Sequence, residues 1–200
     1  MSGRPYSRTR GLALAGTFAA LISVAAQVSI PLPFTPVPIT LQVFVVYLVI
    51  MILGPYYGSL ALLLYLLLGA IGVPVYANVS SGLPVLLGPT GGYLFAFPVA
   101  ALLGGLVSAN RAKSRKVDAV RLAISTAIAI ALIYAIGVTW LASYLNGDFE
   151  KAILFGLIPF IPFDIAKAMI AVPIGLRLRW SNLELPVGTA NPKPVAVGAR

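Results

Sequence analysis

The amino-acid sequence predicts an all-α integral membrane protein with six transmembrane helices. Of its 200 residues, 60% are hydrophobic and only 10% are charged, whereas soluble domains carry about 25% charged residues. Residues 11–110 contain no Asp, Glu, Lys or Arg at all. Because about 20 apolar residues cross the hydrocarbon core as a helix, this stretch alone has room for four crossings joined by short turns.

Glycine and proline residues divide the apolar sequence into six segments. The first three precede a polar, Gly-rich stretch at 74–90, and the last three follow it. Together they make one membrane domain over residues 1–180, followed by a tail at 181–200 whose Pro, Gly and small residues predict disordered cytoplasmic chain. The predicted spans are 11–30, 36–53, 59–71, 92–107, 119–145 and 152–178.

The basic residues predict the orientation of the chain in the membrane. They precede the first span, surround the connection between the fourth and fifth spans, and follow the sixth. Six crossings place all three clusters on one side, which the positive-inside rule makes cytoplasmic together with both termini. A multi-pass plasma-membrane protein therefore explains the net charge of +9 without a nucleic-acid partner. The clusters are Arg4, Arg8 and Arg10; Arg111, Lys113, Arg115, Lys116 and Arg121; and Arg177 and Arg179.

The composition also argues against an enzyme. The chain has no cysteine, no histidine and only five carboxylates, so it lacks thiolate chemistry, the commonest general base and the commonest metal ligand. We expect no metal and no cofactor. No G-x-x-x-x-G-K-[ST] motif occurs, so the chain cannot hydrolyse ATP by itself. A channel would need a repeated pore signature, which is absent.

Asp164 and Lys167 are the only charged residues in the interior of a predicted span, since Arg121 and Arg177 lie at the ends of theirs. A charge there costs a few kcal/mol on insertion scales and marks a functional site by default. Pro159 and Pro162 interrupt the helix just before them, and irregular backbone at membrane depth survives only inside protein or along a cavity. We therefore expect both side chains to meet a polar ligand. The alternatives are a structural ion pair, since the two share a helix face, and helix capping by Asp164.

Three further segments contribute candidate ligand contacts. In the turn before the fourth span, Gly91 and Gly92 allow close backbone approach, helix-start amides attract anions, and Thr90 and Tyr93 offer hydroxyl groups. An ordinary membrane-entry turn is the alternative. In the stretch 74–90, Asn78 offers donors and an acceptor together, and the four prolines of segment 31–38 favour a shaped wall over a simple rigid turn.

A stripe of small residues runs along the first span. Gly11, Ala15, Ala19 and Ser23 lie four residues apart, a spacing that lets helices approach closely in lipid. The stripe fits a docked partner helix and internal packing equally well.

At these segments the sequence resembles the BioY family, the biotin-specific substrate-capture (S) components of energy-coupling-factor (ECF) transporters. The resemblance covers Gly11 to about Arg177. It departs at Phe163, where the family has a small residue, and in the tail after Trp180. The matching blocks are 26–42, 64–75, 87–94 and 159–167.

The resemblance implies an S-component-like bundle of six helices whose outward-facing pocket binds biotin. It also implies a transmembrane coupling subunit and two ATPase subunits as partners, with Ala15 and Ala19 facing the coupling subunit. Asn78, Asp164 and Lys167 match biotin-contacting positions, and residues 90–93 match a turn that lines the pocket. A capture component for another small vitamin is the alternative.

Overall fold

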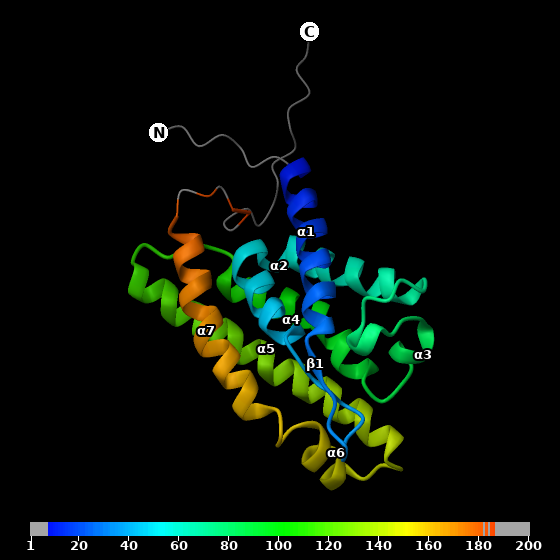
Figure 1. Cartoon of the computed structure of the whole chain (residues 1–200). Helices are drawn as coiled ribbons and strands as arrows, with labels where there is room; N and C mark the ends of the chain where they lie inside the picture. The colour runs from blue at the N-terminus through cyan, green and yellow to red at the C-terminus, as the bar shows by residue number, and fades with distance from the viewer. Residues whose placement is uncertain (1–7, 182, 184, 187–200) are drawn as a thin grey trace.

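The structure, a computed structural model, describes residues 8–181, 183 and 185–186 as a bundle of helices with one short hairpin (Figure 1). Most of the predicted tail at 181–200, together with Arg4, lies outside the described residues. The elements are α1 (Arg8–Gln27), β1 (Ser29–Ile30), β2 (Ile39–Thr40), α2 (Gln42–Ala70), the 3₁₀ turn η1 (Ala77–Val79), α3 (Leu83–Leu86), α4 (Gly91–Ser108), α5 (Arg115–Tyr144), α6 (Phe149–Gly156) and α7 (Ile161–Arg179).

The prediction of a helical membrane protein with several spans is confirmed, apart from the short hairpin, and the count of six stays a prediction. Within the described part of the chain, α1, α2, α4 and α5 are long and apolar enough to cross a membrane, and the bent pair α6–α7 would make a fifth span. The difference from six arises in α2, which contains most of the second and third predicted spans, while residues 39–40 of the second span form β2.

Helix α2 is broken at Gly54. This residue has φ 69° and ψ −168°, a conformation that glycine adopts without a steric penalty. Pro55 follows it and has no backbone N–H, so the carbonyl of Met51, four residues earlier, has no helical donor. The break therefore divides α2 into two helical segments, residues 42–53 and 55–70, of about 18 and 24 Å.

A second break separates α6 from α7, which meet at 48°. Pro159 lies in the turn between them, and Pro162 stands at the start of α7, where a missing N–H costs nothing. The residue that caps α7 is Phe160, with no side-chain hydrogen bond, and Asp164 lies in the first turn. Helix capping by Asp164, one of the two alternatives to ligand binding, is therefore wrong, and the Asp164 carboxylate is available for other contacts.

The centre of the bundle is α2, which packs against α1, α4 and α7. It is apolar on all sides, as expected of a helix surrounded by others. Its side chains Tyr47, Ile50, Leu62 and Tyr65 are fully buried. Helix α5 packs against α4 and also contacts α6 and α7.

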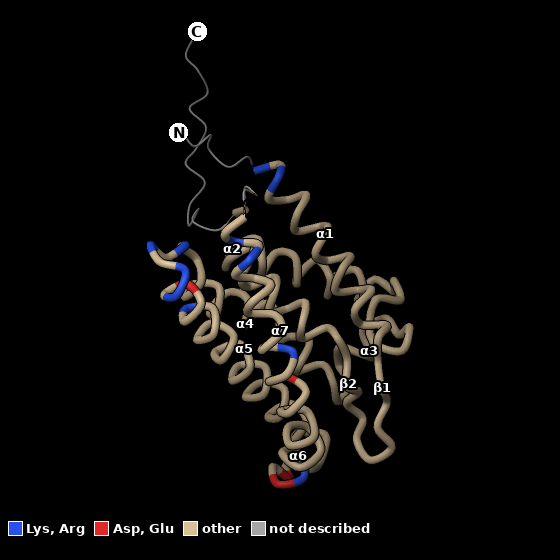
Figure 2. The backbone as a smooth tube through the Cα atoms, turned by 60° about the vertical axis from the view of Figure 1, so that its left-hand side comes forward, with Lys and Arg blue, Asp and Glu red and all other residues tan. Residues whose placement is uncertain are grey.

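The charges separate along the length of the bundle. Figure 2 shows Lys and Arg gathered at the end where α1 and α5 begin and α7 ends, while α6 carries mixed charges at the opposite end. Two short strands pair antiparallel near that second end, with Ile30 opposite Ile39. Thr35, in the loop of this hairpin, donates to the Phe155 carbonyl of α6 at 2.8 Å.

Candidate functional site

A cavity of about 210 Å³ opens between the hairpin, the η1 turn and helices α4, α5 and α7. Ligand pockets commonly measure about 300–1,000 Å³, so this cavity lies below the usual range and has room for no more than one small molecule. Its walls are mainly apolar, and the proline-rich segment contributes residues 36–38, as expected of a shaped wall. The polar residues that line it are Thr40, Gln42, Tyr76, Asn78, Ser80, Thr90, Tyr93, Tyr134, Asp164 and Lys167.

The predicted pair, Asp164 and Lys167, lies in the wall of this cavity. The Lys167 ammonium donates to Asp164 Oδ1 at 2.8 Å, and the two side chains are 13% and 7% exposed. The structure is compatible with both the ligand-site hypothesis and the ion-pair hypothesis, because the two residues form an ion pair and also line the cavity. Low exposure strengthens their attraction relative to a surface pair.

Tyr134 provides a second hydrogen bond to the Asp164 carboxylate. Its hydroxyl, carried by α5, donates to Asp164 Oδ2 at 2.7 Å. The ring of Tyr134 lies edge-on to Tyr93 of α4, with centroids 6.4 Å apart. Tyr93 in turn donates to the Gly156 carbonyl at the end of α6 (2.8 Å). Four helices are therefore linked at the cavity through two hydrogen bonds and one aromatic contact.

The turn before α4 contributes less to the cavity than its sequence suggests. Thr90 and Tyr93 line it, but Gly91 and Gly92 do not. A Cβ at Gly92 would lie 2.2 Å from Cβ of Trp140, and one at Gly91 would lie 1.8 Å from the Leu86 carbonyl oxygen. The amides of Gly91 and Tyr93 already donate to the carbonyls of Gly88 and Thr90. These glycines serve helix packing here, and ligand contact by them remains an untested prediction.

Asn78 reaches the cavity from the η1 turn, as its assignment requires. The neighbouring Tyr76 is held against α2, because its hydroxyl donates to the Leu66 carbonyl at 2.7 Å. Burial raises the pKa of Tyr76 to about 12, so the hydroxyl remains a donor at neutral pH. Two other lining residues, Thr40 and Gln42, bond to each other: the Thr40 hydroxyl donates to Gln42 Oε1, and the Gln42 Nε2 donates to the Tyr65 hydroxyl.

The predicted docking residues point inward. Ala15 and Ala19 are 2% and 1% exposed, and with Gly11 they occupy the face of α1 that packs on α2. A Cβ at Gly11 would lie 2.3 Å from the Tyr57 ring. The structure therefore assigns this stripe to internal packing, the second of the two alternatives, because small side chains let α1 lie against the bulky side chains of α2.

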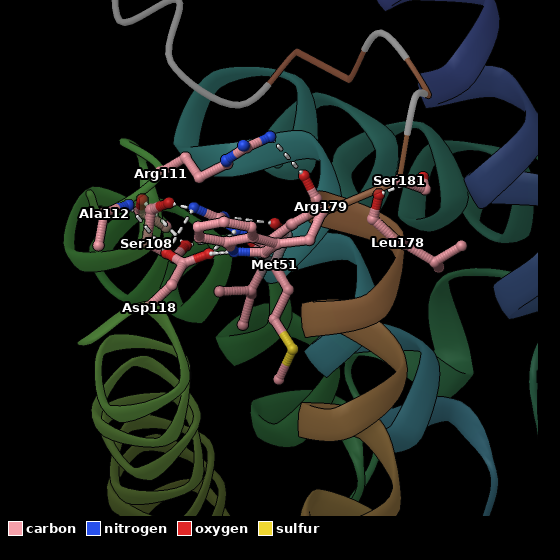
Figure 3. A network of polar contacts seen from close by, with 11 residues as sticks. Met51, Ser108, Arg111, Ala112, Asp118, Leu178, Arg179 and Ser181 are labelled. Carbon is pink, nitrogen blue, oxygen red and sulfur yellow. Dashed lines mark hydrogen bonds and ion pairs between the residues drawn. The ribbon is translucent and has the colours of Figure 1, made fainter. Parts of the chain in front are cut away.

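A second polar cluster, at the end of the bundle where the basic residues gather, lies apart from the cavity and was missed by the sequence analysis (Figure 3). Asp118 and Arg179 pair there at 3.2 Å with fully buried side chains. Asp118 also accepts from the Ala112 amide and the Trp180 indole. Arg111 stacks over the Trp180 ring at 4.2 Å. Sequence reasoning treated Arg111 and Arg179 as membrane-flanking and gave Asp118 no role, because nothing local indicates that these residues meet.

Tyr134 was also missed, because a tyrosine in an apolar helix is usually a packing residue. The one available signal is its hydroxyl, which at membrane depth needs a partner.

Within the described residues, no group of three His, Cys, Asp or Glu side chains could hold a metal ion.

Comparison with known proteins agrees with the resemblance. Residues 1–182 match the BioY family. The biotin transporter BioY of Thermotoga maritima is 47% identical over 88% of this chain and 99% of its own length. The probable biotin transporter BioY of Pyrococcus horikoshii is 43% identical over the same shares. The crystal structure of the S-component for biotin from an ECF-type ABC transporter superposes with a TM-score of 0.76 at 26% identity, over 90% of this chain and 96% of that one.

These matches extend over nearly the whole membrane domain, and the family consists of multi-pass transporter components of the cell membrane. The protein described here therefore belongs to the BioY family and is a membrane transport component, not an enzyme.

Proposed function

We propose that this protein captures biotin from outside the cell in the cavity between the hairpin, the η1 turn and α7. The observation that carries the proposal is the Asp164–Lys167 pair, which lies in the cavity wall with most of its surface buried. Intramembrane charges are rare and belong to substrate sites by default. The names of the relatives and of the superposed structure support biotin as the substrate.

The chemistry of biotin fits the groups that remain free. Each oxygen of Asp164 accepts one hydrogen bond within the chain and keeps capacity for a ureido N–H. Lys167 uses one of its three donors on Asp164, so it has others for the ureido oxygen. Asn78 can complement either group. The bicyclic ring would lie against apolar residues of the wall such as Leu94, Phe97 and Ile133.

The proposed topology has six crossings with both termini in the cytoplasm. It requires the two segments of α2, before and after Gly54, to cross separately, and the bent pair α6–α7 to act as one span. The gathering of basic residues at one end of the bundle supports this arrangement.

Concentrative uptake would need partners, because the sequence contains no nucleotide-binding motif. We propose a transmembrane coupling subunit with two ATPases, as in ECF transporters. Since Ala15 and Ala19 are buried, a partner helix would meet the exposed side of α1, where Ala13, Gly16 and Ala20 are small. A Cβ at Gly16 would have no atom within 4 Å, so this side leaves room for close approach.

Equilibrium binding of labelled biotin to the purified chain, without ATP, tests the proposal. Asp164→Asn removes a charged acceptor worth about 1.5–3 kcal/mol, so the affinity should fall about 10- to 150-fold. The unfolding free energy should also fall, because Lys167 is left unpaired. The alternative is capture of another small vitamin. It predicts that the chain does not bind labelled biotin, and that unlabelled biotin does not displace the vitamin that the chain does bind.

The double variant Asp164→Asn/Lys167→Met separates a ligand site from a structural ion pair. If the pair serves only stability, removing both charges should restore stability and biotin binding together. If it serves the ligand, stability returns and binding does not. Near-native biotin affinity in the double variant would contradict the proposed site.

A further inference from the structure

The turn that carries Asn78 has an unfavourable backbone. The Tyr76 amide donates to the Ser80 carbonyl at 3.0 Å, and the Ser80 amide donates to the Ala77 carbonyl at 3.3 Å. The two central residues, Asn78 and Val79, have φ angles of 58° and 57°. Asparagine tolerates this left-handed region, but a β-branched residue there is a conformational outlier. Such strain persists only where the surroundings enforce it.

Packing does not enforce the conformation of Val79, because its side chain is 69% exposed. The restraint comes instead from Gln27, the last residue of α1. Its Oε1 accepts from the Val79 amide at 3.0 Å. Its Nε2 donates to the Tyr76 carbonyl at 3.1 Å. One side chain thus bonds both sides of the turn and bridges segments 52 residues apart.

The side chain of Gln27 is itself held on α1. Nε2 also donates to the Ser23 carbonyl, one helical turn earlier, at 3.1 Å, and lies 3.5 Å from the Pro74 carbonyl. A glutamine that uses both ends of its amide on backbone groups gives a turn a fixed position relative to the helix. Asn78, at the centre of the turn, is thereby placed in the cavity wall.

We propose that Gln27 is a positioning residue for the ligand: it holds Val79 in the left-handed conformation and so presents the Asn78 amide to the cavity. The Asn78 side chain has no hydrogen-bond partner among the residues that the structure describes, so it is free to meet a ligand carbonyl or N–H. The inference rests on the proposed function, since it needs a ligand in this cavity. It assigns the role to a residue outside the cavity, which acts through the backbone of the turn.

A substitution cycle between Gln27 and Val79 tests the proposal by biotin binding to the full chain. Gln27→Ala removes both bonds to the turn and should weaken biotin binding about tenfold, the effect of one to two net hydrogen bonds. Val79→Gly should restore binding in the Gln27→Ala background, because glycine adopts a positive φ freely and Asn-Gly is the favoured pair for turns with two such residues. Val79→Gly alone should change the affinity less than threefold, about 0.65 kcal/mol.

Two further variants exclude a general effect on α1. Thr17→Ala removes a hydroxyl that bonds only within the helix, to the Ala13 carbonyl, and should leave the affinity unchanged. Gln27→Glu keeps an acceptor for the Val79 amide but sets carboxylate oxygen against the carbonyls of Tyr76 and Pro74, so it should weaken binding as Gln27→Ala does. A role of Gln27 in helix stability alone would not be rescued by a change at Val79.

Hydrogen exchange of segment 74–82 in the ligand-free protein gives a readout that does not depend on biotin. Exchange should accelerate in Gln27→Ala and slow again in the double variant, while the rest of the chain stays unchanged. If the unmodified chain fails to bind biotin, the proposed function fails and this measurement alone judges the turn. If biotin binds but Gln27→Ala matches the unmodified chain, or Val79→Gly gives no rescue, the role assigned to Gln27 is wrong while the proposed function stands.

Discussion

The guanidinium of Arg179 donates a 2.8 Å hydrogen bond to the Met51 carbonyl, the group that Pro55 leaves without a helical partner. The same nitrogen donates to the Ser108 carbonyl, also at 2.8 Å. The Ser108 hydroxyl donates to the Ile50 carbonyl, beside the break in α2. Arg179 at the end of α7 therefore satisfies the Met51 carbonyl that the break exposes, Ser108 of α4 bonds the neighbouring Ile50 carbonyl, and Asp118 balances the charge of Arg179.

Arg179→Ala should destabilise the protein strongly. It leaves the Asp118 carboxylate buried without its counter-ion, a change that costs about 3–5 kcal/mol when a buried pair is broken, and it leaves the Met51 carbonyl without its donor. Thermal unfolding in detergent should show a large loss of stability. Biotin affinity of the fraction that remains folded should be nearly unchanged, because neither residue lines the cavity.

Arg177→Ala is the matched control, since Arg177 is exposed two residues earlier on the same helix. It should leave the unfolding temperature close to that of the unmodified chain. Equal destabilisation by both substitutions would mean that loss of positive charge, and not the buried pair, sets the stability of this end of the bundle.

The positions of the helices were largely predictable because hydropathy and Gly/Pro breaks are local properties. The predicted span 92–107 is α4 (Gly91–Ser108), and 119–145 lies mostly within α5 (Arg115–Tyr144). Asp164 and Lys167 could also be paired in advance, because residues three apart on a helix share a face. Their place in the cavity wall followed from the cost of charge in a membrane.

Contacts between distant segments were not predictable in this way. Asp118 and Arg179 are separated by 61 residues, and Tyr134 and Asp164 by 30, so no spacing rule connects them. The burial of Ala15 and Ala19 depends on which side of α1 faces α2. A stripe of small residues has the same sequence pattern whether its neighbour is in the same chain or in another.

Cysteine labelling of this cysteine-free chain should establish the topology. Ser114 lies exposed before α5, at the basic end, and Glu150 lies exposed in α6, at the other end. In intact cells an impermeant thiol reagent should modify Glu150→Cys and should spare Ser114→Cys until the membrane is opened. Labelling of Ser114→Cys from outside would reverse the proposed orientation.

The two sides of α1 should respond differently to added volume. Ala15→Leu inserts bulk between α1 and α2, and overpacking costs about 1–3 kcal/mol, so the unfolding temperature should fall. Ala20→Leu places the same side chain on the exposed side and should leave stability and biotin binding unchanged. Copurification with the coupling subunit should be weakened by Ala20→Leu. Unimpaired copurification would contradict the proposed docking side.

Tyr134→Phe should show how far biotin affinity depends on the orientation of Asp164. The substitution keeps the ring against Tyr93 but removes the hydroxyl that donates to Asp164 Oδ2. A hydrogen bond to a charged group contributes about 1.5–3 kcal/mol. Part of this loss is recoverable, because the ligand can approach the freed oxygen. We therefore expect a drop in biotin affinity of about 3- to 20-fold, smaller than for Asp164→Asn.

Tyr144→Phe, on the same helix, provides the comparison, because Tyr144 is exposed and does not line the cavity. It should bind biotin like the unmodified chain. The combination of Tyr134→Phe with Asp164→Asn should be less than additive, since the hydroxyl acts through the carboxylate and residues in one network do not contribute independently. Full additivity in the binding free energies would mean that Tyr134 contacts the ligand on its own, and its role would then be direct binding and not support of Asp164.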